Sequence, residues 1–191
     1  MNSFLVVGLG NPGNEYSRSR HNVGFLVVDE LINRFSLKVR KKKQYHYAVY
    51  VCDDGMLFLC KPQTYMNCSG SIFPSVFAVS KLRKDQLLVI VDNFDLPPGM
   101  LRLKSKGTAS SHNGLFSISN ALGTHNYLRL YLGIGKMVPV SQYVLGHWAR
   151  EEEEVYTRMF SQGADFIESL LSNPLASVMS SCNRKIPHES Y

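Results

Sequence analysis

The chain has 191 residues, of which 45% are hydrophobic and 19% are charged, and its formal net charge at pH 7 is +6. This balance is typical of a globular protein with a substantial core, and it excludes disordered, collagen-like and coiled-coil chains. The apolar runs are far shorter than the roughly 20 residues that cross a bilayer, so we expect no membrane span.

The first part of the chain predicts a strand, a helix and a hairpin. Residues 4–9 form an almost continuous apolar run that ends in glycines, which is the pattern of a strand buried on both faces. Apolar residues then recur at helical spacing over 23–35, and a basic connection, 38–43, follows. The runs 45–51 and 56–61 flank an Asp-Gly turn signal and therefore predict a hairpin.

A helix and two strands are predicted in the middle of the chain. Residues 67–80 have helical character, and Pro74 must lie in the first turn of this helix or kink it. The apolar run 86–91 predicts a second buried strand. In 100–104, apolar and basic residues alternate, as in an edge strand or a strand with one exposed face.

The last third predicts a short helix over 114–122, a strand over 128–132 and a long C-terminal helix. The glutamates at 151–154 lie in the first turn of that helix, where the helix dipole favours negative charge. We expect the polar tail after Pro174 to be loosely ordered. Because strands and helices alternate and no linker divides the chain, we predict one α/β domain over residues 1–191, with a twisted mixed sheet between helices.

The cysteines and histidines indicate neither a disulfide framework nor a metal site. The four cysteines include no Cys-x-x-Cys pair, and the six histidines include no His-x-x-x-His pair. We therefore expect no bound metal. Together with an N-terminus that lacks the features of a signal peptide, the cysteine pattern predicts a reduced, cytoplasmic protein.

Polar residues gather where the predicted strands end. The first strand leads to Asn11 and soon to 20–22, the hairpin leads to 61–67, the central strand ends at 92–95, and the next strand leads to 112–114. Ligands of open α/β sheets bind beyond the carboxyl ends of the strands, so we expect one site with His, Asp and several amides. Such a site can catalyse hydrolysis. The His takes a proton from water, the Asp orients the imidazole ring of the His, and amide N–H groups stabilise the oxyanion that forms.

Residues 8–13 also match the G-x-G-x-x-G fingerprint of dinucleotide-binding proteins, which keeps a nucleotide-dependent oxidoreductase open as a hypothesis. In that fingerprint a helix begins directly at the glycines. Here Pro12 and the polar run 14–20 intervene, so we interpret the match as fortuitous. No G-x-S-x-G nucleophile motif is present either, which favours water as the nucleophile.

Several segments, in order, resemble the signature blocks of the bacterial-type peptidyl-tRNA hydrolase family. These segments are 8–25, 61–70, 92–99, 112–115, 133–135 and 143–146. The resemblance extends from Phe4 to about Leu171. It implies a single α/β globule that cleaves the ester between a peptide and the 3′ end of tRNA and so recycles tRNA from stalled translation. It also implies that no metal or organic cofactor is needed, and we expect a monomer without an obligate protein partner.

The resemblance also assigns roles to individual residues. His21 is expected to be the general base, Asp92 to stabilise its basic form, and Asn11 to distinguish N-blocked peptidyl from free aminoacyl substrates. Contacts to the substrate or the tRNA end are expected from Tyr16, Tyr65, Asn67 and Asn113. Taken without the resemblance, these four residues have structural alternatives: a helix cap for Asn67, a turn for Asn113, and core or rim aromatics for the tyrosines.

Two features depart from the family pattern. The loop 108–111 lacks the glycines that are usual there, and Tyr131 stands where relatives commonly have the arginine of a phosphate-binding pair. We predict that Lys104 and Lys136 contact tRNA phosphates instead, with Arg129 a weaker candidate because packing can occupy its side of the strand. Because of these departures, a second hypothesis is that the protein is a non-catalytic relative that only binds RNA. The His–Asp pair argues against this hypothesis, since RNA binding alone does not require such a pair.

Overall fold

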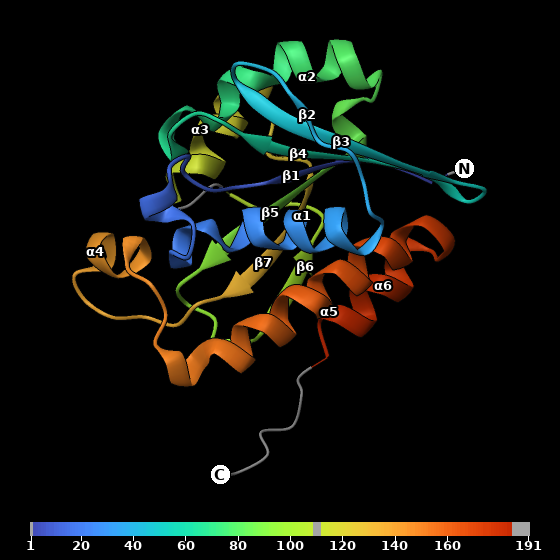
Figure 1. The fold of residues 1–191 in the computed structure, drawn as a ribbon. Helices are drawn as coiled ribbons and strands as arrows, with labels where there is room; N and C mark the ends of the chain where they lie inside the picture. The colour runs from blue at the N-terminus through green and yellow to red at the C-terminus, as the bar shows by residue number, and fades with distance from the viewer. Residues whose placement is uncertain (1, 109–111, 185–191) are drawn as a thin grey trace.

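The computed structural model describes residues 2–108 and 112–184. Its centre is a seven-stranded twisted sheet with the strand order β2-β3-β4-β1-β5-β7-β6 (Figure 1). The strands are β1 (Asn2–Gly8), β2 (Arg40–Lys41), β3 (Tyr45–Cys52), β4 (Gly55–Pro62), β5 (Leu87–Asn93), β6 (Leu101–Lys104) and β7 (Leu128–Gly133). β4, β1, β5 and β7 are parallel, and β2, β3 and β6 pair antiparallel to their neighbours. The predicted mixed sheet is confirmed, and the carboxyl ends of the parallel strands share one edge.

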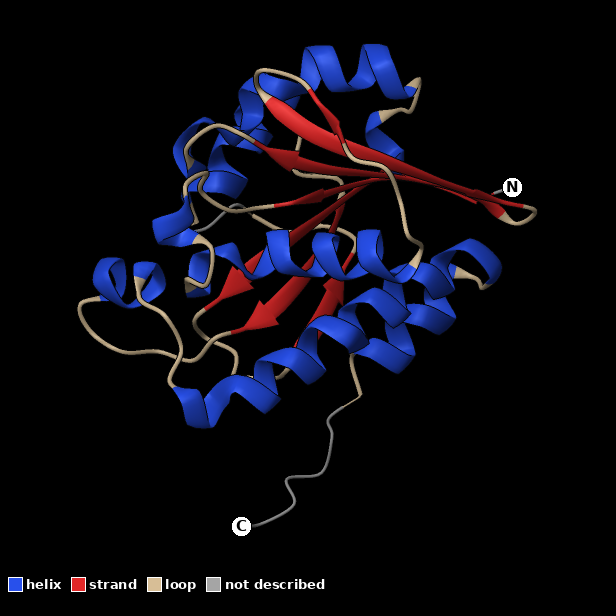
Figure 2. Ribbon diagram, in the orientation of Figure 1, coloured by secondary structure: helices blue, strands red, loops and turns tan. Residues whose placement is uncertain are grey.

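Helices cover both faces of this sheet (Figure 2). They are α1 (Val23–Arg34), α2 (Phe73–Ser80), α3 (Asn113–Leu122), α4 (Val140–Leu145), α5 (Glu153–Ser172) and α6 (Leu175–Cys182). Side chains of α1, α5 and α6 form one apolar core with the sheet, and side chains of α2 and α3 form a second core on the opposite face. Val6 of β1 belongs to the first core, whereas its neighbours Leu5 and Val7 belong to the second. This alternation explains why the central strands are continuously apolar in sequence.

The segment predicted as a helix over 67–80 has two parts. Met66–Ile72 is a 3₁₀ helix, and α2 begins only at Phe73, with Pro74 in its first turn as expected. The 3₁₀ part lies tightly against α3, because a Cβ added to Gly70 would lie 2.2 Å from the carbonyl oxygen of Ser117. The backbone N–H of Gly70 also donates to Ser117 Oγ at 2.9 Å. This close approach between backbones is a tertiary feature that helical periodicity does not report.

The expectation of a loosely ordered tail after Pro174 is wrong for residues 175–184. These residues include α6, whose Val178 and Cys182 are buried against the sheet. After the helix, the side-chain amide of Asn183 pairs with the edge strand β6: Leu103 N–H donates to Asn183 Oδ1 at 2.8 Å, and Asn183 Nδ2 donates to Leu103 O at 2.9 Å. The tail is ordered because it covers a sheet edge.

Within the described residues, no helix is both long enough and apolar enough to cross a membrane.

Candidate active site

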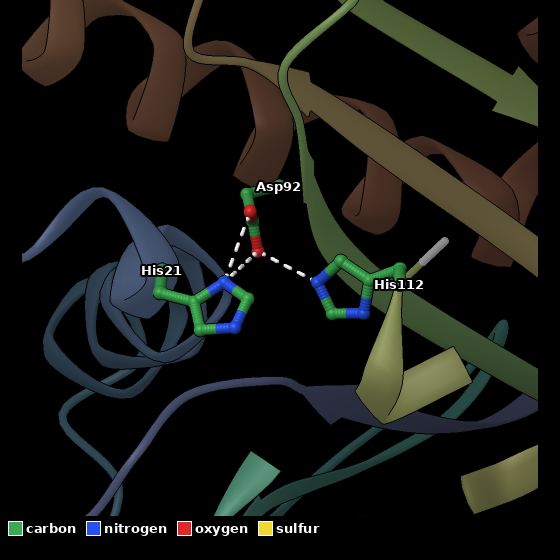
Figure 3. Close-up of side chains that lie close together, drawn as sticks. All are labelled: His21, Asp92 and His112. Atoms are coloured by element: carbon green, nitrogen blue, oxygen red, sulfur yellow. Dashed lines mark hydrogen bonds and ion pairs between the residues drawn. The ribbon is translucent and has the colours of Figure 1, made fainter. Parts of the chain in front are cut away.

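Three side chains from separate segments meet at the carboxyl edge of the sheet (Figure 3). Asp92 is the penultimate residue of β5 and is 4% exposed. His21 lies in a 3₁₀ helix, Arg20–Asn22, that leads directly into α1, and His112 lies immediately before α3. The sheet topology therefore brings together residues that are far apart in sequence, as the polar strand ends predict.

The Asp92 carboxylate lies between the two imidazole rings. Nδ1 of His21 lies 2.9 Å from Asp92 Oδ1 and 3.0 Å from Oδ2, and Nε2 of His112 lies 2.9 Å from Oδ1. The centres of the two rings are 5.0 Å apart. We call this arrangement of His21, Asp92 and His112 the His–Asp–His row.

Hydrogen bonds from the backbone determine the tautomer of His112. Its Nδ1 faces the N–H groups of Gly114 and Leu115 at 3.2 and 3.4 Å, so this nitrogen accepts and the imidazole serves as the N-cap of α3. Nε2 of His112 must then carry the proton and donate to Asp92. On the other side of the carboxylate, Nδ1 of His21 donates, so Nε2 carries a lone pair and points away from Asp92 (Figure 3). Within residues 2–108 and 112–184, this Nε2 has no hydrogen-bond partner.

The electrostatics of the row favour a charged Asp92 and a basic His21. Burial by itself lowers the pKa of His21, but the negative charge and hydrogen bond of Asp92 outweigh burial, so this pKa lies above its ordinary value. Burial alone raises the pKa of Asp92, but its attraction to His21 and His112 and their hydrogen bonds hold it well below its usual range. Asp92 therefore remains ionised, and His21 is a stronger base than a free histidine.

Asn11 is fixed by hydrogen bonds on both its backbone and its side chain, and one of its partners is Asn22, which directly follows His21 of the row. Asn22 accepts from the Asn11 N–H through Oδ1 at 2.8 Å and donates to the Asn11 carbonyl through Nδ2 at 2.9 Å. The Oδ1 of Asn11 accepts from the N–H of Met66 at 2.8 Å. Because Oδ1 is occupied, the Nδ2 group of Asn11 is the part that remains available as a donor to a ligand.

The remaining predicted substrate contacts occupy exposed or partly exposed positions, and Asn113 directly follows His112 of the row. Tyr65 is 65% exposed, Asn67 and Asn113 are exposed, and Tyr16 is partly exposed. The 3₁₀ helix that contains Asn67 and the helix α2 that follows it have no side-chain cap. Among the described residues, neither Asn67 nor Asn113 makes a side-chain hydrogen bond within 3.5 Å, so their structural alternatives have no support. Their substrate roles stay predictions.

The predicted phosphate contacts, Lys104 and Lys136, are both exposed: Lys104 ends β6, level with Arg129 near the start of β7, and Lys136 follows the carboxyl end of β7. Lys104 Nζ lies 5.8 Å from the centre of the Tyr131 ring, and both residues line a hollow of about 160 Å³ together with Arg102. Lys136 Nζ lies 3.7 Å from the Asp95 carboxylate. The neighbouring loop departure at 108–111 lies outside the described residues except for Thr108.

Arg129 lies on the same face of β7 as Tyr131 but does not reach solvent. It is 0% exposed, with its guanidinium 4.1 Å from the Tyr127 ring centre and Nη2 donating to the carbonyl of His125 at 2.9 Å. The weaker phosphate candidate of the sequence analysis is therefore wrong, because packing fills that side of the strand.

The sequence analysis includes His112 and Asn22 among the polar residues that gather at the strand ends, but it assigns no role to either. His112 precedes a predicted helix, but Ser, Thr, Asp and Asn are the usual caps there, so an imidazole gave no capping signal. Its neighbour Asn113 received the functional assignment instead. The one available signal for both residues is that they adjoin predicted site residues in the blocks 20–22 and 112–114.

The row also brings together potential metal ligands. His21, Asp92 and His112 each offer one ligand atom, and these atoms lie within 4.8 Å of one another. In the hydrogen-bonded arrangement above, however, both nitrogens that face Asp92 carry protons, and metal binding would have to displace them. The absence of a metal from the chemistry stays a prediction.

Comparisons with known proteins identify the family of this chain. The family model described as peptidyl-tRNA hydrolase matches residues 5–189. A peptidyl-tRNA hydrolase from Borreliella burgdorferi is 42% identical over 93% of this chain and 98% of its own, and one from Geobacillus kaustophilus is 41% identical over 94% and 98%. The crystal structure of peptidyl-tRNA hydrolase from Acinetobacter baumannii superposes with a TM-score of 0.89 at 30% identity, covering 97% of each chain. Sequence, fold and near-complete coverage therefore agree that this chain belongs to the peptidyl-tRNA hydrolase family.

Proposed function

We propose that this protein hydrolyses the ester between a peptide, or an N-blocked aminoacyl group, and the 3′ end of tRNA. The observation that carries the proposal is the His–Asp–His row, in which a buried carboxylate orients His21 so that its Nε2 points away from Asp92 and can accept a proton. All members of the row come from one chain, which supports a monomer without an obligate protein partner. The net charge of +6 suits a polyanionic substrate. We place the protein in the cytoplasm, where such substrates arise during translation.

The proposed reaction needs no covalent intermediate. His21 Nε2 removes a proton from a water molecule while the water oxygen attacks the ester carbonyl carbon. The side-chain N–H groups of Asn11 and Asn113 donate to the oxygen that becomes negatively charged. The bond from the carbonyl carbon to the ribose O3′ then breaks, and the proton held by His21 passes to O3′. The products are a tRNA with its 3′-hydroxyl restored and a peptide with a free carboxylic acid, which ionises by releasing its proton to solvent.

Incubation of the purified protein with N-acetyl-aminoacyl-tRNA and with the unblocked aminoacyl-tRNA tests the function. We expect release of the acetylated amino acid and much slower release of the unblocked one. A nucleic-acid-binding protein without catalysis would retain the tRNA and release neither acyl group.

Chelation should leave the reaction intact. Because the row works through hydrogen bonds and proton transfer, we expect EDTA to change hydrolysis of a short blocked aminoacyl-oligonucleotide by less than about twofold. The short substrate is the control for Mg²⁺ that is bound to full-length tRNA. Loss of activity in EDTA, with recovery only when a divalent ion is added, would show instead that the row holds a metal.

Removal of a phosphate contact should reduce the salt dependence of tRNA binding. For Lys104→Ala and Lys136→Ala, we expect the slope of log affinity against log salt concentration to become shallower by roughly 0.7–0.9 for each true contact. Lys136 pairs with Asp95, so its contact requires an exchange of partners. The measurement is tRNA binding across a salt series, with the exposed Lys38→Ala as a matched control. If both variants keep the wild-type slope, neither lysine contacts phosphate, and the basic run 41–43 becomes the candidate for these contacts.

A further inference from the structure

The arginine that directly precedes His21 is buried, and its side-chain partners lie in the chain after β7. Arg20 is 8% exposed. Its Nη1 donates to the carbonyl of His147 at 2.7 Å, and its Nη2 donates to Oε2 of Glu152 at 2.8 Å. A charged group buried to this extent needs well-placed partners, so these contacts determine where the chain lies at residue 20.

The main chain around Arg20 is attached to the same part of the protein. The N–H of Arg20 donates to the carbonyl of Gly146 at 3.0 Å, and Ser19 forms an antiparallel β-bridge with His147. We call residues 140–152, which include α4, the α4 segment. In Figure 1, α4 lies beside the turn of helix that leads into α1. The 3₁₀ helix that carries His21 is therefore held to the α4 segment by both side chain and main chain.

Tyr143 of α4 connects this attachment to the strand that carries Asp92. The centre of its ring lies 4.2 Å from the guanidinium carbon of Arg20, which is a cation–π contact. Its hydroxyl donates to the carbonyl of Ile134 at 2.5 Å, and the N–H of Ile134 donates to the carbonyl of Asn93 at 3.0 Å. Asn93 directly follows Asp92 in β5. Tyr143 thus contacts Arg20 on one side and the end of β5, through one residue, on the other.

Together with the hydrogen bond between His21 and Asp92, these contacts form a closed network. The network passes from His21 to Asp92, then along β5 to Asn93, and returns through Tyr143 to Arg20, which adjoins His21. We call it the Arg20 network. It holds both partners of the His–Asp pair through the chain next to each of them. Such precision matters for catalysis, because a displacement of about 1 Å can cost on the order of 10²-fold in rate.

From this network we propose that Arg20 is a positioning residue for the hydrolysis, which fixes the orientation of His21 relative to Asp92 through the α4 segment. The inference goes beyond the proposed function but rests on it. Arg20 takes no part in the proton transfer. An arginine suits the task because its planar guanidinium donates to His147 and Glu152 at the same time and stacks on Tyr143, which a lysine cannot reproduce.

Substitutions of Arg20 test the proposal by separating turnover from binding. For Arg20→Ala, we expect kcat for N-acetyl-aminoacyl-tRNA hydrolysis to fall by about 10²-fold. The Kd for tRNA should change by less than about threefold, because neither Lys104 nor Lys136 belongs to the Arg20 network. Arg20→Lys should recover part of kcat, since an ammonium group can still pair with Glu152. An unchanged kcat in a folded Arg20→Ala would overturn the proposal.

Arg18→Ala is the matched control. Arg18 lies two residues from Arg20 and likewise pairs with a glutamate at the start of α5, Glu153, and its guanidinium carbon lies 5.3 Å from the centre of the Trp148 ring. Its side chain is 57% exposed and is no part of the Arg20 network. We therefore expect wild-type kcat in this variant. A loss as large as that in Arg20→Ala would overturn the proposal, because any lost ion pair between these segments would then slow the reaction.

Tyr143→Phe tests the other half of the network with little risk to folding. The variant keeps the ring beside Arg20 and removes the hydrogen bond to Ile134, so we expect kcat to fall by about fivefold. The double variant Arg20→Ala/Tyr143→Phe should be slower than Arg20→Ala by less than about twofold, because one break is enough to open the network. Losses that multiply would overturn the proposal. If Arg20→Ala is unfolded by circular dichroism, Tyr143→Phe and Arg20→Lys decide, and wild-type kcat in both overturns it.

NMR of histidine-labelled protein reports the geometry without reference to activity. The Nδ1–H signal of His21, assigned by its absence from His21→Ala, exchanges slowly with water while it is bonded to Asp92. We expect faster exchange in Arg20→Ala and the wild-type rate in Arg18→Ala. Wild-type exchange in a folded Arg20→Ala would overturn the positioning role whatever its kcat. A wild-type protein that hydrolyses no peptidyl-tRNA would instead contradict the proposed function, and the NMR comparison would still test the network.

Discussion

His21→Ala should reduce the single-turnover rate of N-acetyl-aminoacyl-tRNA hydrolysis by about 10³-fold, within the range that general base catalysis contributes. The variant loses the one nitrogen that faces away from Asp92 and can accept a proton from water. Binding of tRNA should be unchanged, because the predicted phosphate contacts lie on β6 and after β7. The measurements are rapid-quench kinetics with excess enzyme and a tRNA titration.

His125→Ala is the control for this experiment, since it removes an exposed histidine that lies away from the row. It should retain wild-type kinetics. A near wild-type rate in His21→Ala would show that His21 is not the general base. An equal loss of rate in His21→Ala and His125→Ala would indicate a general effect on stability.

Asp92→Asn should reduce the rate by about 10²-fold and shift the pH profile. At low pH His21 is protonated and inactive, so activity rises as the pH passes through its pKa, which Asp92 holds above the ordinary value. When the negative charge is removed, burial remains as the main influence and lowers that pKa. The acid limb of the profile should therefore move to lower pH, while the plateau falls because the ring is less well oriented.

The measurement is log kcat/KM between about pH 5 and 9, a range that brackets the ordinary pKa of histidine. Asp85→Asn serves as the control, because Asp85 is exposed and pairs only with Arg83 in the described part of the chain. An acid limb that stays in place in Asp92→Asn would mean that a group other than His21 controls it.

The order of strands and helices could be predicted because the way each element is buried determines the spacing of apolar residues along its own sequence. Central strands that pack on both faces are continuously apolar, and β6, at the sheet edge, alternates buried and exposed residues. The strand β2 could not be predicted, because both of its residues, Arg40 and Lys41, are exposed and basic. Helix α6 was missed for a related reason: what stabilises it is contact with β6, which is about 75 residues earlier in the chain.

The site could be predicted only as far as residue type and strand ends allow. The pairing of His21 with Asp92 was expected from their positions, and the structure confirms that they are in contact. The participation of His112 depends on the path of the chain into α3, which no periodicity encodes. The burial of Arg129 likewise depends on Tyr127 and on the neighbouring chain, so its charge alone suggested an exposed phosphate contact that the fold does not provide.

The side-chain amide of Asn183 has a practical consequence for work on this protein. It satisfies both backbone groups of Leu103, the residue that precedes Lys104 on the edge strand. A truncation before residue 183, or a bulky tag fused close to it, leaves these groups open to pairing with a strand of another molecule. Such a protein should be prone to aggregation and should bind tRNA less tightly even with an intact His–Asp–His row. Tags are therefore better placed at the N-terminus, and a C-terminal deletion series needs a tRNA-binding assay beside the hydrolysis assay.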